Sequence, residues 1–280
     1  MAEDGRAPKL RLGGMALRNG LLVHGPTSWC VAVRNRAGEI EVTTGRKPVF
    51  SRGRLGRIPL LRGPLRLAEA VAVLPLARLR SRSARLPYED PRVVVTAAGV
   101  VAASSAARRL ARGHATREAI VGVLGLLPAL AALRDRELAA YHGAEHKAIG
   151  AYESGGRAAD EPKEHRRCGS NLLVPMVALS VAGQVAVERW VEKPTALHRG
   201  IASLLSTGAA VELFAFAERR PDAPLSRAVH GTGHEIQRLI STREPTPEQL
   251  AVAEAAVEEL LRVEGEAADR DGDDPQPERA

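Results

Sequence analysis

The sequence predicts a mainly helical α+β protein, in which a small N-terminal antiparallel β unit precedes an Ala-rich helical bundle embedded in a membrane. Two observations support this fold class. Short apolar runs separated by turn residues fill residues 13–46, which is the pattern of antiparallel strands. Runs of Ala, Leu and Val with helical spacing follow within residues 58–262. Because aromatic residues make up only 3% of the chain, the helices are expected to pack through small side chains.

The β unit is expected to begin after a polar stretch, residues 1–12, that its composition assigns to disorder. Within the unit, Asn35–Glu39 has the composition of a hairpin turn between two strands. Cys30 alternates with Trp29 inside one strand, so we interpret it as a packing residue. The helical part that follows is interrupted by prolines that are expected to start or kink helices, namely Pro59, Pro64 and Pro75.

Four apolar segments flanked by arginines bear on the location of the protein, at about residues 93–112, 117–134, 170–189 and 198–217. A spanning helix needs ~20 mostly apolar residues, and only the third segment reaches that length without a charged residue. Two interpretations follow, an integral membrane protein or a soluble bundle whose buried helices have the same hydropathy. In the first, the lipid bilayer is the main partner and the basic flanks face anionic headgroups.

The C-terminal part is expected to form an amphipathic helix over residues 246–262. Thr246 is a capping residue, Pro247 suits the first helical position, and Gln249 completes a capping box. Apolar residues recur on one face beside acidic ones, which favours docking of this helix on the body. The acidic residues 264–280 are predicted to be disordered.

The formal net charge is +7, and the acidic tail offsets part of it, so the body is more basic than the total suggests. A basic body suits either nucleic acid or anionic lipid. Aromatic stacking residues are not interleaved with the arginines, so no nucleic-acid partner is expected. The two cysteines lie far apart in the sequence and provide no disulfide framework, which favours a reducing compartment.

A candidate metal site begins at Tyr141–Lys147. On a helix, His142 and His146 lie four residues apart on one face, where two imidazoles can reach one ion, and Glu145 lies beside them. The order His-x-x-Glu-His is that of the inverzincin metallopeptidases, in which the histidines bind zinc and the glutamate activates water. The alternative is a histidine pair that is solvated or hydrogen-bonded to a nearby carboxylate.

Three further residues are candidates to complete the site. His165 and Cys168 lie three residues apart, and Glu212 lies inside the fourth apolar segment, where an unpaired charge is costly. Together with the two histidines they offer more than the four ligands of tetrahedral zinc. Each also has a simpler interpretation. His165 would lie in a solvated loop, Cys168 would be a small buried side chain, and Glu212 would pair with an arginine of a neighbouring helix.

Several stretches together resemble the YqhQ-like family of bacterial proteins. They occur in the family's order and are 13–26, 31–40, 58–63, 141–153, 165–170 and the start of the last helix from Ser241. The resemblance implies membrane-spanning segments and a metal-dependent enzyme. Three positions depart from the family pattern, because Met15 replaces a glutamine, Asn19 a glutamate and Arg166 a proline. If the carboxylate that is absent at Asn19 acts in catalysis or binds metal, the chemistry of this member is expected to be altered.

These patterns predict a membrane-associated, metal-dependent hydrolase. His142 and His146 would hold a divalent ion, most simply zinc, and His165, Cys168 or Glu212 would complete the site, with Glu145 as general base. The rival hypothesis is a non-catalytic membrane or assembly factor whose His and Glu residues form a structural hydrogen-bonded network. The basic excess before the first segment puts that side in the cytoplasm, and two spans return the site to it, so we expect a cell-membrane protein with a cytoplasmic site. A soluble cytoplasmic bundle is the alternative.

Overall fold

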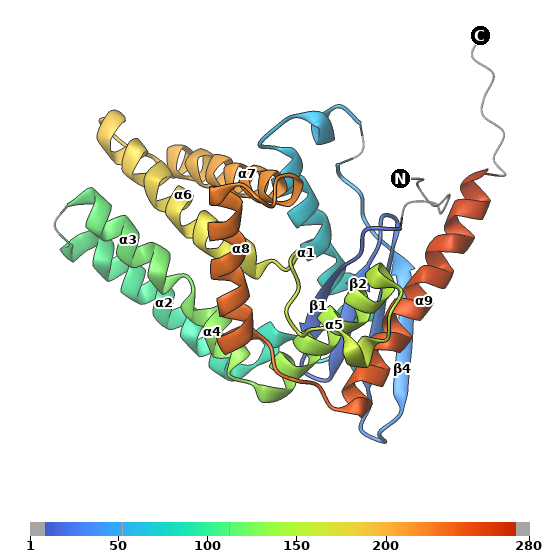
Figure 1. Cartoon of the computed structure of the whole chain (residues 1–280). Helices are drawn as coiled ribbons and strands as arrows, with labels where there is room; N and C mark the ends of the chain where they lie inside the picture. The colour runs from blue at the N-terminus through green and yellow to red at the C-terminus, as the bar shows by residue number, and fades with distance from the viewer. Residues whose placement is uncertain (1–8, 52, 112, 273–280) are drawn as a thin grey trace, which may run out of the picture.

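The computed structural model describes residues 9–51, 53–111 and 113–272, and Figure 1 shows a sheet flanked by helices from which longer helices extend to one side. The four strands form one antiparallel sheet in the order β1-β2-β3-β4: β1 Gly13–Leu17, β2 Gly20–His24, β3 Ser28–Arg34 and β4 Ile40–Arg46. Each strand pairs with the next in sequence, so the sheet is a meander. The predicted α+β class, mainly helical with a small N-terminal β unit, is confirmed.

The two faces of the sheet pack against different helices, as the alternation of side chains along a strand requires. One face carries Leu21 and Cys30 and packs against helices α5, Arg136–Ser154, and α9, Pro247–Gly272. The opposite face carries Trp29 and packs against α1, Arg62–Arg80. Cys30 and Trp29 are both almost fully buried, so the sheet and its helices form a closed core.

Local sequence signals define the ends of the two helices on the first face. At the start of α5, the Asp135 carboxylate accepts a hydrogen bond from the Glu137 N–H at 3.0 Å. Gly155 ends the helix in a left-handed conformation with φ 81°. At the start of α9, Thr246 and Gln249 exchange side-chain and backbone hydrogen bonds, which form the capping box.

Helix α9 is longer than the sequence indicates. It continues to Gly272, whereas composition assigns residues 264–280 to disorder. The physical reason is that Glu264 is buried and its carboxylate accepts hydrogen bonds from the N–H groups of Thr27 and Ser28, at 2.9 and 2.7 Å. These donors compensate the cost of burying the charge. Residues 273–280 lie outside the described residues.

Of the segment predicted to be disordered, residues 9–12 contact the end of α5, whereas residues 1–8 lie outside the described residues. The Leu10 N–H donates to the Tyr152 hydroxyl at 2.8 Å, and Lys9 Nζ donates to the Tyr152 carbonyl at 2.8 Å. Leu12 belongs to the core between the sheet and α5. Contacts with the end of α5 therefore order this segment.

Four helical stretches are long and apolar enough to cross a membrane, judged by length and composition. They are α2, Pro91–Leu110; Ala115–Leu133, which comprises most of α3, His114–Leu124, and α4, Leu127–Leu133; α6, Ser170–Trp190; and α7, Ala196–Arg219. In Figure 1, α2 and α3 form one hairpin and α6 and α7 another, and both extend away from the sheet. The buried share of these stretches rises only from 0% in α2 to 28% in α7, which suggests membrane association.

Small residues and ion pairs join the apolar helices to their neighbours. Gly208 in α7 lies against the Leu60 carbonyl, and an added Cβ would come within 2.1 Å of that oxygen. Arg108 of α2 pairs with the buried Glu118 of α3 at 2.6 Å. Arg108, one of the arginines that flank the apolar segments, therefore neutralises the charge of a buried carboxylate.

The remaining elements bring two backbone segments alongside α5. Helix α8, Pro224–Ile236, leads into a π-helical turn, Gln237–Ser241, and the Arg243 N–H then donates to the Ala139 carbonyl of α5 at 2.9 Å. The loop between α5 and α6 passes the same helix at Lys163. Short 3-10 turns occur at Leu55–Arg57, Pro87–Glu89 and Ala158–Asp160.

Candidate metal centre

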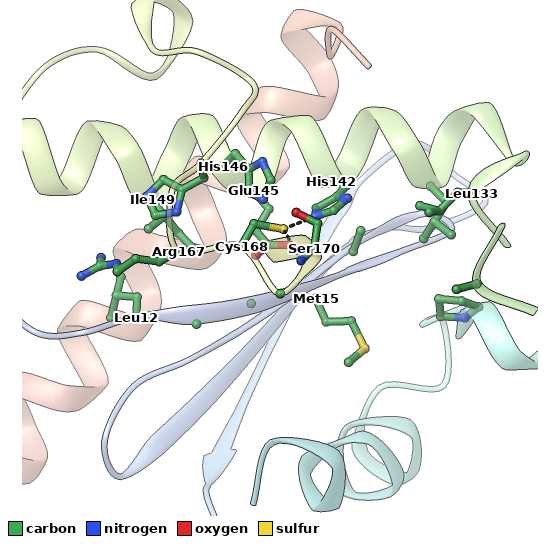
Figure 2. Close-up of a pocket in the computed structure, with 18 of the residues that line it drawn as sticks. Leu12, Met15, Leu133, His142, Glu145, His146, Ile149, Arg167, Cys168 and Ser170 are labelled. Atoms are coloured by element: carbon green, nitrogen blue, oxygen red, sulfur yellow. Dashed lines mark hydrogen bonds between the residues drawn. The ribbon is translucent and has the colours of Figure 1, made fainter. Parts of the chain in front are cut away.

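A cavity of about 440 Å³ lies between the edge strand β1 and helix α5. The start of α6 and the end of α4 complete its wall. Figure 2 shows the side chains of His142, Glu145 and His146 descending from α5 toward Cys168, which lies between the helix and the strand. The cavity therefore brings the His-x-x-Glu-His motif together with two of the three further candidates, His165 and Cys168.

The two imidazoles of the motif are held by backbone carbonyl groups. His142 Nδ1 lies 2.8 Å from the Ser241 carbonyl oxygen, and His146 Nδ1 lies 2.6 Å from the Lys163 carbonyl oxygen. Because a carbonyl oxygen only accepts, each Nδ1 must carry the proton and donate it. In the neutral imidazoles both Nε2 atoms therefore carry a free lone pair, which is the arrangement that orients histidine ligands in metal sites.

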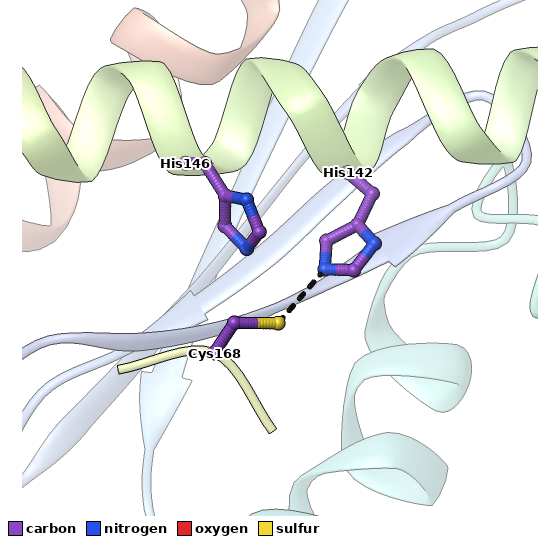
Figure 3. Close-up of side chains that lie close together, drawn as sticks. All are labelled: His142, His146 and Cys168. Atoms are coloured by element: carbon purple, nitrogen blue, oxygen red, sulfur yellow. Dashed lines mark hydrogen bonds between the residues drawn. The ribbon is translucent and has the colours of Figure 1, made fainter. Parts of the chain in front are cut away.

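Cys168 provides a third donor at the same point. Its Sγ lies 3.4 Å from His142 Nε2, and the ligand atoms of His142, His146 and Cys168 all lie within 4.8 Å of one another. Figure 3 shows the two rings and the sulfur converging between α5 and the loop that precedes α6. Burial lowers the pKa of His146 and so favours its neutral form, which is the form that binds metal. Two imidazoles and a thiolate suit zinc in type and in number.

Glu145 is a buried carboxyl group beside the cluster. Burial raises its pKa to about 7, and the nearby His142 and His165 oppose that rise. Its Oε2 has no hydrogen-bond partner among the described residues. Gly14 of β1 provides the space for this side chain, since a Cβ at Gly14 would come within 2.6 Å of Glu145 Oε1. A carboxyl group with a pKa near 7 can accept and return a proton at neutral pH.

His165 lines the cavity but makes a different contact. Its Nε2 lies 3.2 Å from a Glu153 carboxylate oxygen, and its ring centroid lies 5.7 Å from that of His146. Burial lowers its pKa, against the opposing effect of Glu145 and other carboxylates. Glu153 also pairs with Arg167, so His165 belongs to a charged group next to the cluster rather than to the three converging donors.

Glu212 is not brought to the cluster, and the proposal that it ligates metal there is corrected. It lies on α7, where its carboxylate receives two hydrogen bonds from the Arg62 guanidinium, one of them at 2.6 Å from Nε. This is the ion pair with a neighbouring arginine that sequence reasoning held as the alternative. The pair satisfies a carboxylate that would otherwise be costly in an apolar helix.

Asn19, which replaces a glutamate of the family pattern, is not among the residues that line the cavity. Its amide nitrogen donates to the carbonyl oxygens of Arg34 and Ser83, both at 2.9 Å, and its amide oxygen accepts from the Arg85 N–H at 3.0 Å. A carboxylate has no donor for the two carbonyls. Asn19 thus joins the β1–β2 turn to the segment before α2.

Sequence reasoning missed several groups that build the site. The carbonyls of Lys163 and Ser241 carry no sequence signal, because any residue presents one. Gly14 had a signal in its resemblance to the family, although its role next to Glu145 became visible only in the structure. Arg167, which lies next to Cys168 in the sequence, lines the cavity but was not among the predicted site residues.

The fold and the site define a class: a mainly helical protein that has, within the described residues, four candidate membrane spans and a partly buried His-His-Cys cluster next to a small sheet. Residues 91–263 match the model of a family described as a protein of unknown function, DUF1385. This match covers more than half of the chain, so the chain belongs to that family. The resemblance to YqhQ-like proteins is thereby confirmed.

One curated relative is the "Uncharacterized protein YqhQ" of Bacillus subtilis (strain 168). The two are 28% identical over 132 residues, a match that covers 44% of this chain and 40% of that protein. The chain thus matches less than half of the length of this relative. No solved structure matches the chain.

Proposed function

We propose that this protein is a membrane-embedded, metal-dependent hydrolase. His142 Nε2, His146 Nε2 and the Cys168 thiolate would hold a divalent ion, for which zinc is the best fit, and leave a fourth position for water or substrate. Such an ion would supply Lewis acidity and make water nucleophilic at neutral pH. Glu145 would act as the general base.

One observation carries this proposal: the two Nδ1 groups both donate to backbone carbonyls, so two unprotonated Nε2 atoms face one sulfur. A pair of histidines that served only to hold backbone segments would not need a thiol at the point where their free nitrogens converge. All three ligand atoms also lie within 4.8 Å of one another, a spacing that one ion bridges with small side-chain movements.

The role of Glu145 follows from its surroundings. Its buried carboxyl group, with a pKa of about 7, lines the cavity next to both histidines and is half protonated near neutral pH. Its Oε2 lacks a hydrogen-bond partner among the described residues, so this atom remains available to take a proton from water or to give one to a leaving group.

Metal analysis of the purified full chain tests the proposal, with the two cysteines as a matched pair. Wild type is expected to contain about one equivalent of zinc by elemental analysis. Cys168→Ala, and His142→Ala combined with His146→Ala, are expected to lose most of it, because each removes ligands. Cys30→Ala should retain it, since Cys30 is buried inside the sheet core. Metal-free wild type, or equal metal content in all variants, would refute the proposal.

Glu145→Gln separates the catalytic role from metal binding. The neutral amide keeps the size of the side chain but cannot take up a proton, so this variant is expected to retain zinc and lose hydrolytic activity toward candidate substrates. Loss of metal together with activity would instead make Glu145 a ligand or a support of the ligands.

A second candidate is a non-catalytic membrane or assembly factor. The same imidazole-to-carbonyl bonds favour it, because they tie α5 to the segments at Lys163 and Ser241 without any ion. In that case His142→Ala and His146→Ala would lower the melting temperature of a protein that never contained metal, and Glu145→Gln would leave its function unchanged.

The membrane location is part of the proposal, with the site on the cytoplasmic side. The four apolar helical stretches support it by length and composition. The protein is expected to remain in the membrane fraction after washes with high salt and alkaline carbonate, because spanning helices are released only by detergent. Release by either wash would mean that the helices form the core of a soluble or peripheral bundle.

A further inference from the structure

Part of the wall of the site cavity is built from the ends of candidate membrane spans and the residues next to them. Pro87 lies just before α2, Ala129–Leu133 forms the end of the second stretch, and Cys168–Ser170 leads into α6. Three of the four stretches therefore begin or end at this one cavity. If these helices cross a membrane, the cavity lies at the boundary between the bilayer and the sheet-bearing part.

The cavity is also divided along its length. Figure 2 shows Arg167 at one end of the row of side chains below α5, the His-Cys cluster in the middle, and Leu133 at the other end. Arg167 and His165 share Glu153, so the first end carries charged groups, beside the apolar Leu12 and Ile149. The Leu133 end is lined by alanines and proline and carries no charged side chain among the residues that line the cavity.

We propose that the substrate of this site is an amphiphile of the cytoplasmic leaflet, whose chain lies against Ala129, Ala132 and Leu133 and whose polar group lies at the His142–Cys168 cluster. The proposal rests on the proposed function and names its substrate class. A small hydrophilic substrate would have no use for an apolar wall that ends in the lipid-facing part of the chain. An acyl or isoprenoid chain gains ~0.8 kcal/mol for each methylene that the wall removes from water.

The size and position of the cavity suit such a ligand. About 440 Å³ falls in the range of pockets that hold small molecules, which is ~300–1,000 Å³. The apolar end adjoins α4, whose Leu127 and Leu130 are exposed on the outer surface of the same helix. The inner wall and the exposed apolar surface are thus two sides of one short helix, which places the apolar end of the cavity next to the proposed bilayer.

Photolabelling from a bilayer tests the proposal without any assumption about metal. The full chain would be reconstituted into phosphatidylglycerol vesicles doped with a phospholipid that carries a diazirine in its acyl chain. After irradiation, mass spectrometry would locate the adducts. Wild type is expected to carry adducts at Ala132 or Leu133, which are partly buried, in addition to those on exposed helix faces. Ala132→Trp, which fills the apolar end, should lower the cavity adducts at least fivefold.

Leu130→Trp is the matched control, because Leu130 lies on the same helix, is 37% exposed and does not line the cavity. It should leave the cavity adducts unchanged. Ala129→Phe provides a second blocking variant in case Ala132→Trp does not fold, as judged by circular dichroism. Adducts confined to exposed positions such as Val95 and Val101, or cavity adducts that neither blocking variant lowers, would overturn the proposal.

Zinc content measured on the same samples separates this inference from the proposed function. Stoichiometric zinc without cavity adducts would leave the metalloenzyme in place and reject a lipid substrate. Cavity adducts without zinc would support the amphiphile as the ligand of the cavity and reject the metal. Neither result depends on a known catalytic activity.

Discussion

Two parts of the chain are both rich in Ala, Val and Leu but differ in how far these side chains are buried. One part consists of the sheet, α5 and α9, and the other of α2, α3, α6 and α7. In the first, Leu21, Val31 and Leu260 are completely buried. In the second, Val95 and Val101 of α2 are 71% and 68% exposed. The sheet-bearing part has its own core, whereas the exposed apolar side chains of the other helices suggest membrane association.

This difference also explains where the candidate site lies. Its donors come from α5, which belongs to the closed core, and from Cys168, two residues before the first residue of α6. A metal site requires ligands held to within a few tenths of an ångström, which a packed helix can provide. Access for a ligand requires an open edge, which the junction with the apolar helices can provide. The site occupies the border between the two parts.

The largest expected effect contrasts one leucine from each part. Leu260→Ala in α9 removes a fully buried side chain and is expected to lower the free energy of unfolding by ~2–5 kcal/mol. Leu204→Ala in α7, at a side chain that is 44% exposed, should cost less than ~1 kcal/mol. Denaturant titration in detergent, followed by the fluorescence of the buried Trp29 in a Trp190→Phe background, would measure both. An equal loss of unfolding free energy in the two variants would contradict the proposed difference between the two parts.

A charge on an exposed helix face tests whether lipid is the external medium. Val101 lies near the middle of α2, and Val101→Lys in a bilayer should make insertion of that helix less favourable by ~3 kcal/mol. We expect less protein in the carbonate-resistant membrane fraction, with Val101→Leu as the control. If the lysine variant behaves like the leucine variant, the exposed face of α2 meets water instead.

The sheet-bearing part should also lose stability in mild acid because of His24. Burial, followed by the nearby charge of Lys47, lowers the pKa of His24 from 6.5 to about 4 in the folded state. The unfolded state therefore binds a proton below pH 6.5 that the folded state excludes, and the stabilisation present above pH 6.5 is lost as pH falls toward about 4. At pH 5 the contribution of His24 should have fallen by ~2 kcal/mol, whereas the raised pKa of Glu145 acts in the opposite direction, so the His24 effect is measured as the difference from a variant without this histidine.

Melting curves at pH 7 and pH 5, again followed by Trp29, would detect this change. His24→Gln, which cannot take up a proton, should reduce the difference between the two pH values. An unchanged difference in that variant would assign the acid sensitivity to other groups.

The smallest expected effect concerns the end of α9. Glu264→Gln removes the charge that accepts from the Thr27 and Ser28 N–H groups and should cost ~1–2 kcal/mol. Glu258→Gln, at an exposed position on the same helix, should change stability by less than ~0.5 kcal/mol. The same titration distinguishes the two. A neutral result for Glu264→Gln would mean that the last turns of α9 contribute little to the sheet-bearing part.

Within the site, the sequence determined the residues that lie close together on one element. His142, Glu145 and His146 are grouped by the 3.6-residue period of a helix, and the Asp135 cap and Gly155 stop define that helix locally. The alternation of strands 13–46 and the Ala-rich runs likewise predicted the fold class, because both periods are properties of the local backbone.

Tertiary structure alone decided which distant residue joins them. Cys168, His165 and Glu212 all carry groups that can bind metal. In the structure Glu212 is hydrogen-bonded to Arg62 and His165 contacts Glu153. Of the three, only Cys168 faces the two Nε2 atoms. The carbonyls of Lys163 and Ser241, which set the tautomers, are 17 and 99 residues from their histidines. The helical conformation at Glu264 likewise depends on a distant segment, because the carboxylate accepts hydrogen bonds from Thr27 and Ser28 at the β2–β3 turn. Local periodicity carries no information about such pairings, since they depend on how separate elements pack.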